Sequence, residues 1–359
     1  MLGFRPIKGF NALQLFVYFQ IKCMEKNYQM FVGVDVSKEK LDYCIISKTD
    51  NFAPQFGIIT NNAKEINKLI TKIKKKYPSK EQVLFCMENT GSYSMPLCFW
   101  LQSNEAHYWV VAPLAIKRSK GITRGKSDKA DARDIASYAL THLHQLKLSE
   151  IPEDDIVELR LLLAEREKLV KSIAIFTSTA ESKNFLPKEL MKATLKHNNA
   201  TISFLKKQLL SIDKLIDNVI QRNETFKKQD NLLQSIPGIG KQTSIMFIAY
   251  TQAFTLFKNH RQFACYAGVA PFEYSSGSSV RGKTKVSQLA NKKLKALLTM
   301  AALTAKKHDP QLKLYYDRKV AEGKNKMLVM NAIRCKLVSR AFAVINRDSK
   351  FVNTLKAVA

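Results

Sequence analysis

The sequence predicts an α/β N-terminal region, a long helical hairpin after it, and a mainly helical C-terminal region. Short β-rich runs alternate with helical segments before residue 150, and amphipathic helical periodicity fills residues 153 to about 230. Its 359 residues suffice for more than one domain. We therefore expect an N-terminal extension (1–29), an α/β domain (30–150), a helical coiled-coil connector (151–230) and a C-terminal domain (231–359).

The strands of the α/β domain are predicted from apolar, β-branched runs that end at turn residues. The runs Phe31–Val36 and Leu41–Ser47 are separated by four polar residues, which predicts a hairpin. Two further runs, Gln82–Met87 and His107–Ala112, follow the helical segment Lys64–Tyr77. Strands separated by helices indicate a partly parallel sheet.

The connector is predicted to be an antiparallel helical hairpin or coiled coil, because its periodicity breaks once, near residues 184–187. After it, Gly238 and Gly240 bracket a turn before Lys241. The pattern is like a helix-hairpin-helix element, whose amides and following helix N-terminus receive a DNA phosphate. An ordinary tight turn between helices is the alternative. The rest of the C-terminal region is expected to be helical, interrupted by a loop over Ala270–Lys285.

The charge of the chain indicates a polyanionic partner. Lys and Arg number 58 against 30 acidic residues, a net charge of +28, and residues 231–359 hold 22 Lys or Arg against 5 Asp or Glu. Nucleic acid is the leading candidate, although ribosomal and membrane-surface proteins are also basic. No CxxC pair supports a zinc finger, and no apolar run reaches the roughly 18–20 residues of a membrane span. A cytoplasmic, nucleoid-associated protein with no membrane partner is expected.

Four carboxylates are the first candidate site. Asp35 interrupts an apolar strand, and Glu88 stands where another strand ends. Asp128 and Asp131 share one face of a helix through their i,i+3 spacing. Together they would form an oxygen-lined pocket for a pair of Mg²⁺ (or Mn²⁺) ions that supports phosphodiester chemistry. The alternatives are helix capping by Asp128, a surface salt bridge for Asp131 and a structural role for Asp35.

Two further segments are candidate nucleic-acid contacts. A basic stretch before the acid pair is interpreted as a loop that grips phosphates, or else as a solvated loop; it comprises Lys117, Arg118, Lys120, Arg124 and Lys126. The Ser/Gly-rich loop contains Ser276, with Arg281 and Lys283 close behind. A flexible connector is the plain interpretation of such a loop. A serine nucleophile would instead form a covalent phosphoserine and conserve the bond energy for rejoining.

The chain resembles the DEDD insertion-sequence transposases of the insertion sequence one-hundred-and-ten family. Six blocks carry the resemblance in order: Val34–Lys38, Met87–Tyr93, Lys126–Ala132, Ile236–Gly240, Tyr266–Pro271 and Ser276–Gly282. One departure is Lys295, where the family often has an Arg; Lys lacks the bidentate phosphate geometry of Arg.

The resemblance implies a RuvC-like, RNase H-type fold for the N-terminal domain, with the metal site on Asp35, Glu88, Asp128 and Asp131. It implies a catalytic serine in the C-terminal domain, and Ser276 matches it best among Ser275, Ser276, Ser278 and Ser279. It also implies a noncoding guide RNA that pairs with donor and target DNA, and a homo-oligomer, either a dimer or a tetramer.

Three functions are weighed. The first is a metal-dependent, RNA-guided transposase that cuts and rejoins DNA through a serine. The second is a RuvC-like nuclease or resolvase that cuts through activated water in the acidic pocket. The third is a basic nucleic-acid-binding scaffold whose acids are structural.

Overall fold

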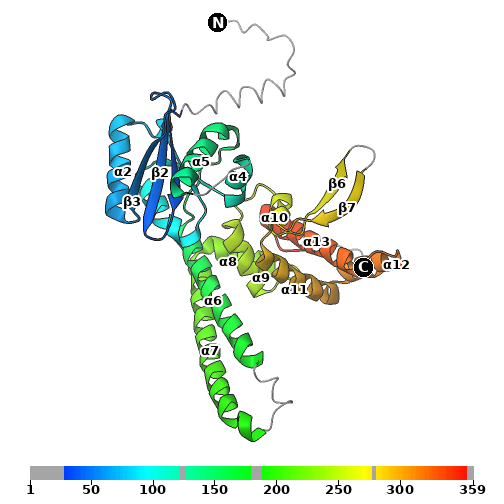
Figure 1. Ribbon diagram of the computed structural model, residues 1–359. Helices are drawn as coiled ribbons and strands as arrows, with labels where there is room; N and C mark the ends of the chain where they lie inside the picture. Colours follow the sequence, from blue (N-terminus) through cyan, green and yellow to red (C-terminus); the bar gives the residue numbers. More distant parts are fainter. Residues whose placement is uncertain (1–27, 122–126, 179–187, 277–279, 354–359) are drawn as a thin grey trace, which may run out of the picture. The chain divides into compact units, whose positions relative to one another are not determined.

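The computed structural model describes residues 28–121, 127–178, 188–276 and 280–353 (Figure 1). These residues form two compact units, one ending at Ile151 and the other beginning at Pro152. Each unit is described by itself.

The N-terminal unit is built on a five-stranded sheet with the order β3-β2-β1-β4-β5. Strands β1 to β3 pair antiparallel, whereas β4 and β5 extend the sheet in parallel with β1. This strand order is that of the RNase H-like class, so the predicted fold class is confirmed. The strands are β1 Met30–Val36, β2 Lys40–Ser47, β3 Gln55–Thr60, β4 Val83–Glu88 and β5 His107–Val111.

Helices cover both faces of this sheet (Figure 1). On one face, Val32, Val34 and Val36 of β1 pack with apolar residues of α2 and α3, while Phe31 belongs to the core beneath α4 and α5. The alternation follows from the two-residue period of a strand. The helices are α2 Ala63–Lys76, α3 Met95–Ser103, α4 Pro113–Ser119 and α5 Asp128–Thr141, with short 3₁₀ turns at Lys80–Gln82, Gly91–Ser94 and Leu143–Gln145.

Helix α5 lies directly against the backbone of β1 at Gly33. A Cβ built on Gly33 would lie 2.2 Å from the backbone N of Ala136 and 2.3 Å from the carbonyl O of Ala132. No real side chain tolerates such distances, so only glycine lets the helix backbone rest on the strand. Ala132 and Ala136 are fully buried there beside Cys44 of β2.

Gly33→Ala is expected to destabilise the protein by about 1–3 kcal/mol or more, because the added methyl group meets backbone atoms rather than flexible side chains. Urea denaturation of both proteins measures this free energy. Gly240→Ala is the matched control, since a Cβ on Gly240 meets nothing within 4 Å. Equal unfolding midpoints for the Gly33 variant and the wild type would show that α5 is not held at this point.

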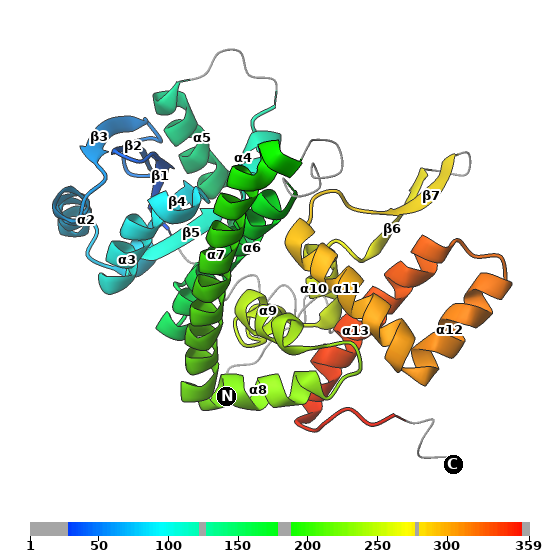
Figure 2. The same cartoon turned by 90° about the horizontal axis from the view of Figure 1, so that it is seen from below.

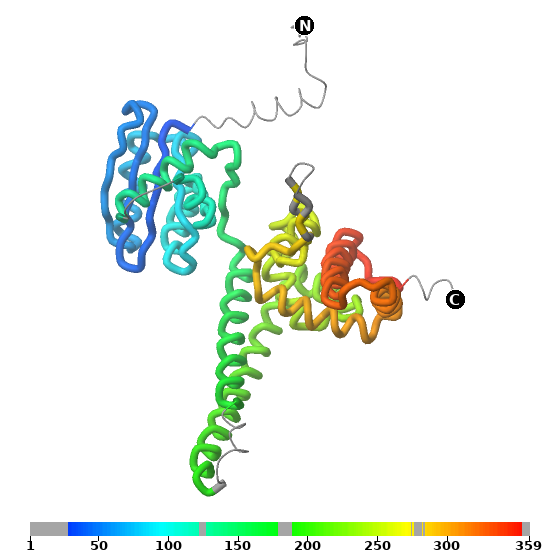
Figure 3. Tube along the Cα trace, turned by 45° about the vertical axis from the view of Figure 1, so that its right-hand side comes forward, coloured from blue at the N-terminus to red at the C-terminus, as the bar shows by residue number. Residues whose placement is uncertain are grey.

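The C-terminal unit is mainly helical, as predicted. Two long helices, α6 and α7, run side by side as the arms of a hairpin (Figure 3). The second arm ends sooner than its apolar periodicity suggests, because the side chain of Asn223 accepts a hydrogen bond from Phe226 N and starts a new helix, α8. The helices are α6 Asp154–Ser178, α7 Lys188–Arg222, α8 Glu224–Gln234, α9 Lys241–Thr251, α10 His260–Tyr266, α11 Lys292–His308, α12 Pro310–Ala321 and α13 Lys326–Arg347 (Figure 2).

One hydrophobic core joins the base of this hairpin to the helices that follow it. Ile156 and Leu159 of α6 and Val219 of α7 are buried in the same cluster as Phe263 and Leu337. The base of the hairpin therefore belongs to the core of the C-terminal unit.

The expectation of an irregular loop over residues 270–285 was wrong. Strands β6 (Pro271–Ser276) and β7 (Val280–Val286) form an antiparallel hairpin, paired from Pro271 opposite Val286 to Ser276 opposite Val280. The Ser/Gly-rich tip led to the prediction of a loop, although the flanking aromatic and β-branched residues favour strands.

Among the residues that the structure describes, no helix has both the length and the apolar character needed to cross a membrane.

Candidate active site

Three neighbouring strands carry acidic residues on the sheet face that packs against α5. Asp35 of β1 lies opposite Asp42 of β2 in the antiparallel register. The parallel pairing of β1 with β4 reaches Val34 opposite Met87, so Glu88 is the next residue along β4 from this pair, as Asp35 is along β1. Because side chains alternate along a strand, Asp35 shares its face with Phe31 and Gly33.

The N-terminal turn of α5 supplies two more carboxylates. The helix begins at Asp128, and the side chain of Ser127 caps it by accepting a hydrogen bond from Ala130 N at 3.2 Å. The cap is therefore Ser127 rather than Asp128, which leaves Asp128 and Asp131 in the first turn. Negative charge is favourable there because it complements the helix dipole.

The acids interact electrostatically. The pKa of Asp35 is raised from 3.8 to about 6, first by burial and then by the negative charges of Asp131, Asp128, Glu88 and Asp42. Each neighbour disfavours the ionised form of Asp35, so the five carboxyl groups form one cluster.

Two lysines neutralise part of this cluster. The Lys40 ammonium lies 2.7 Å from a carboxylate oxygen of Asp128 and 3.0 Å from one of Asp42. Lys120 lies 2.7 Å from Asp131 and 3.3 Å from a further acid, Asp134. These contacts raise the pKa of Lys40, through its hydrogen bonds to Asp128 and Asp42.

Sequence reasoning missed three members of this arrangement: Lys40, Asp42 and Asp134. A signal for Asp42 existed in the alternation of the strand. Leu41 and Tyr43 lie on one face of β2, so Asp42 between them lies on the opposite face, which packs against α5. Lys120 was expected to face the substrate, and in the structure it binds the acids instead.

Within the described part of the chain, no three His, Cys, Asp or Glu side chains already have the spacing that would hold a metal ion. The chemistry of the donor set nevertheless fits a hard divalent cation, because carboxylate oxygens are the ligands that Mg²⁺ prefers. Lys40 and Lys120 hold Asp128 and Asp131 in ion pairs, so these two acids would have to exchange ammonium partners for a metal ion.

The other predicted contacts of the N-terminal unit lie outside this cluster or outside the described residues. Lys117 and Arg118 are exposed in the last turn of α4. Arg124 and Lys126 lie outside the described residues.

In the C-terminal unit, the turn after α8 is packed rather than open at Gly238. A Cβ on Gly238 would lie 2.5 Å from Ala305 Cβ and 2.6 Å from the carbonyl O of Ala301, so α11 covers this position. Gly240 precedes α9 with open space around it. Lys241 forms an ion pair with Asp217 of α7.

The serine candidate ends strand β6. Ser276 pairs with Val280 through the backbone, at the base of the hairpin tip. Residues 277–279 and the side chains of Ser276, Arg281 and Lys283 lie outside the described part of the chain. Ser275, one residue earlier, is exposed.

Comparisons with known proteins identify relatives of this chain. A sequence profile described as "Transposase" matches residues 32–182, and one described as "Transposase IS116/IS110/IS902 family" matches residues 230–317. The chain is 26% identical over 332 residues to the pilin gene-inverting protein of Moraxella bovis, covering 91% of this chain and 98% of that protein.

A partial match is to the uncharacterized 43.6 kDa protein of insertion element IS110 from Streptomyces coelicolor, with 32% identity over 33% of this chain and 29% of that protein. Among solved structures, RuvC of T. thermophilus in complex with a Holliday junction substrate matches 34% of this chain and all of that chain, with a TM-score of 0.26 and 8% identity.

An RNase H-like sheet with an acidic cluster at its α5 face, in a chain matched by two transposase profiles, defines a DNA transposase or recombinase. The chain belongs to the IS116/IS110/IS902 family of transposases.

Asp35→Asn is expected to stabilise the metal-free protein at neutral pH. The pKa of Asp35 is higher in the folded protein than in the unfolded chain. The folded protein therefore loses stability as pH rises from about 4 to about 6, and the loss is complete above about pH 6. The Asn amide does not ionise, so the variant avoids this loss of folding free energy, which is about 1–2 kcal/mol after solvent screening.

Urea denaturation in the presence of a chelator measures the difference at about pH 7.5 and at about pH 4. The gain should be large at the higher pH and should shrink toward zero at the lower one. Glu39→Gln, which changes an exposed acid in the β1–β2 turn, is the control. A variant as stable as the wild type at both pH values would show that the carboxylates do not repel one another.

Proposed function

We propose that this transposase cuts and rejoins DNA by using its acidic cluster as a divalent-metal site and Ser276 as a nucleophile, under the direction of a noncoding guide RNA. The observation that carries the proposal is the position of Asp35, which follows the β1–β4 pairing beside Glu88 and is repelled by Glu88 and by Asp128 and Asp131 of α5. A structural cluster would be expected to match each acid with a cation, whereas the charges of the described residues that shift the pKa of Asp35 are all those of other acids.

Asp35, Glu88, Asp128 and Asp131 would hold Mg²⁺ or Mn²⁺. When bound, the metal supplies Lewis-acid stabilisation of the charge that develops on phosphate and leaving oxygens. The carboxylates orient the ions and offset their charge, and the sheet fixes two of the four acids on adjacent strands. Lys40 and Lys120, released from Asp128 and Asp131, would then be available to hold the phosphates beside the scissile one.

Ser276 would attack the scissile phosphorus through its hydroxyl oxygen. The Oγ–P bond forms as the bond from phosphorus to one sugar oxygen breaks; the serine proton passes to a base, and the sugar oxygen takes up a proton. The phosphoserine conserves the energy of the phosphodiester, which a new sugar hydroxyl recovers on rejoining. Attack by water would instead hydrolyse the phosphodiester, and its bond energy would then not be conserved for rejoining.

The guide RNA is supported by the positive charge of the chain. A net charge of +28 provides cationic side chains for the backbones of two nucleic acids. The oligomer is supported by the hairpin, whose helices expose large apolar side chains, among them Leu161, Ile175, Leu190, Phe204 and Leu210. A second copy of the chain would cover such residues.

Ser276→Ala is expected to abolish strand exchange, with at least a thousandfold loss of rate, while DNA binding stays at the wild-type level. A recombination assay with donor DNA, target DNA and the RNA transcribed beside the gene measures it. Ser275→Ala is the matched control, because it removes the adjacent exposed hydroxyl. Recombination by the Ser276 variant would remove serine from the mechanism, and cleavage without a covalent protein–DNA adduct would favour the nuclease that uses water.

Mg²⁺ or Mn²⁺ is expected to raise the melting temperature of the wild type, because a ligand that binds only the folded state stabilises it by mass action. Glu88→Gln and Asp131→Asn should reduce this shift by half or more, whereas Glu39→Gln should keep it. Differential scanning fluorimetry across a metal titration reports the effect. Identical shifts in all four proteins would place metal binding elsewhere.

Phe204→Glu combined with Leu210→Glu is expected to shift the protein toward the monomer, because each introduces a charge on an apolar surface of α7. Light scattering after size-exclusion chromatography gives the mass directly. Gln208→Glu, an exposed polar position on the same helix, should leave the oligomer intact. A wild-type mass for the double variant would mean that α7 does not mediate assembly.

A further inference from the structure

The last three helices carry a strong positive charge. Between Leu303 and Arg340 the sequence has ten Lys or Arg and three Asp or Glu. Two of the three acids are already paired: Asp309 with Arg340 at 2.5 Å and Glu322 with Lys319 at 2.6 Å. Most of the positive charge is therefore not offset locally.

Two adjacent tyrosines on α12 organise part of this charge. The Lys336 ammonium of α13 lies 4.6 Å from the ring centroid of Tyr315, and the Lys306 ammonium of α11 lies 4.6 Å from that of Tyr316. The Arg318 guanidinium is also over Tyr315, at 6.0 Å. We call Lys306, Tyr315, Tyr316, Arg318 and Lys336 the tyrosine–lysine surface.

The two lysines of this surface make no ion pair with a carboxylate among the described residues. A cation–π contact orients an ammonium group without neutralising it. Each lysine is therefore held in place and still carries a full charge to offer to an anion, which lowers the ordering cost of binding.

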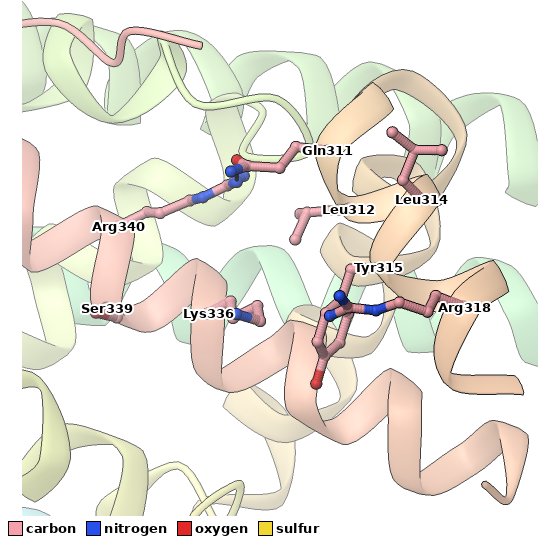
Figure 4. A pocket seen from close by; sticks show the side chains of 8 residues that line it. All are labelled: Gln311, Leu312, Leu314, Tyr315, Arg318, Lys336, Ser339 and Arg340. Atoms are coloured by element: carbon pink, nitrogen blue, oxygen red, sulfur yellow. Dashed lines mark hydrogen bonds between the residues drawn. The ribbon is translucent and has the colours of Figure 1, made fainter. Parts of the chain in front are cut away.

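Each flank of α12 has a groove. One, about 580 Å³, is lined by Tyr315, Arg318, Lys336 and Arg340. Figure 4 shows the Arg318 guanidinium beside the Tyr315 ring, with Lys336 and Arg340 projecting from α13. The other, about 470 Å³, is lined by Leu303, Lys306, Lys307, Lys313 and Asp317. Cations thus lie on both sides of one helix.

A buried ion pair fixes the geometry between the grooves. Asp309 accepts hydrogen bonds from Gln311 N and Leu312 N at the start of α12 and binds Arg340 of α13 with its other oxygen. Its side chain is fully buried. Arg340 is thereby occupied, and Arg318 lies 3.8 Å from a carboxylate oxygen of Glu322. Among the described residues, Lys336 is therefore the cation of the first groove that has no carboxylate partner.

We infer that the tyrosine–lysine surface binds the phosphodiester backbone of duplex DNA. Repeated anions are needed to engage cations on both flanks of a helix roughly 10–12 Å across, and a nucleic-acid backbone presents charges in such a series. The inference deepens the proposed function and rests on it for the choice of DNA as the anion. Arg318 and Lys336 lie beyond the residues that the family profile matches.

The contact would fix position and affinity without reading sequence. Lysines and an arginine over aromatic rings reach phosphate oxygens, whereas base edges require side chains inside a groove of the DNA. We therefore expect variants of this surface to weaken binding equally for all sequences.

The test is fluorescence anisotropy of a labelled DNA duplex, titrated with full-length protein over a range of salt concentrations in the presence of a chelator. Lys306→Gln with Lys336→Gln is expected to raise Kd about tenfold or more and to reduce the slope of log K against log salt by about two. The matched control is Lys171→Gln with Lys319→Gln, which removes the same two charges from lysines already paired with Glu167 and Glu322. It should change Kd less than about twofold.

A second pair of double variants tests whether the tyrosine rings orient the lysines, with the charge of the lysines left unchanged. Tyr315→Phe with Tyr316→Phe keeps both rings and should bind like the wild type. Tyr315→Leu with Tyr316→Leu, if its melting temperature shows an intact fold, should weaken binding in the same direction as the lysine pair.

Wild-type Kd and salt slope for Lys306→Gln with Lys336→Gln would overturn the inference. So would an equal loss in the control pair, which would mean that only total charge matters. A loss confined to an RNA probe of the same length would overturn DNA as the occupant. Because the assay requires neither metal nor cutting, failure of Ser276 or of the metal site would leave its result unaffected.

Discussion

The contact of α5 with β1 at Gly33 is the constraint on which the acidic cluster depends. A helix normally stands about 10 Å from a sheet because side chains fill the space between them. Here the backbone atoms of Ala132 and Ala136 occupy the place where a Cβ would lie. The first turn of α5 is brought down with them, and with it Asp128 and Asp131. The small residues and the acids are thus two parts of one arrangement, since a bulkier residue at Gly33 would lift the acids away from Asp35.

Bringing five carboxylates together costs free energy, and the chain offsets that cost in two ways. Burial and neighbouring charge hold the pKa of Asp35 near 6, so this group accepts a proton readily. Lys40 and Lys120 supply positive charge to the acids at the margin of the cluster. Both devices act on the same oxygens that a divalent ion would bind. An ammonium group is a weaker partner for two carboxylates than a doubly charged ion, so a divalent ion would be able to displace Lys40 and Lys120 from the acids.

Sequence reasoning recovered the elements whose signal is local. The first two strands, the sheet-ending Glu88 and the acids of α5 follow from alternation and i,i+3 spacing. Most of the misses concern pairing between segments. Asp42 became part of the cluster only because β2 lies opposite Asp35, and a single strand pattern does not reveal its neighbour. Lys120 lies beside acids of α5, and the sequence around Lys120 does not reveal that contact either. The hairpin β6–β7 was missed because its Ser/Gly tip dominated the composition, and α8 because apolar periodicity continues past its capping residue, Asn223.

The distribution of charge separates binding from chemistry. A cluster of carboxylates repels a polyanion, so the face that would cut DNA contributes little affinity until cations cover it. The attraction must come from elsewhere in the chain, and residues 231–359 hold 22 of its 58 Lys and Arg with only 5 of its 30 acids. In the helices α11 to α13, aromatic rings rather than carboxylates orient Lys306 and Lys336, which preserves the charge of these two lysines. A transposase organised as proposed would bind DNA before a metal ion occupies its acidic site, because the groups proposed to hold the backbone are not those proposed to react with it.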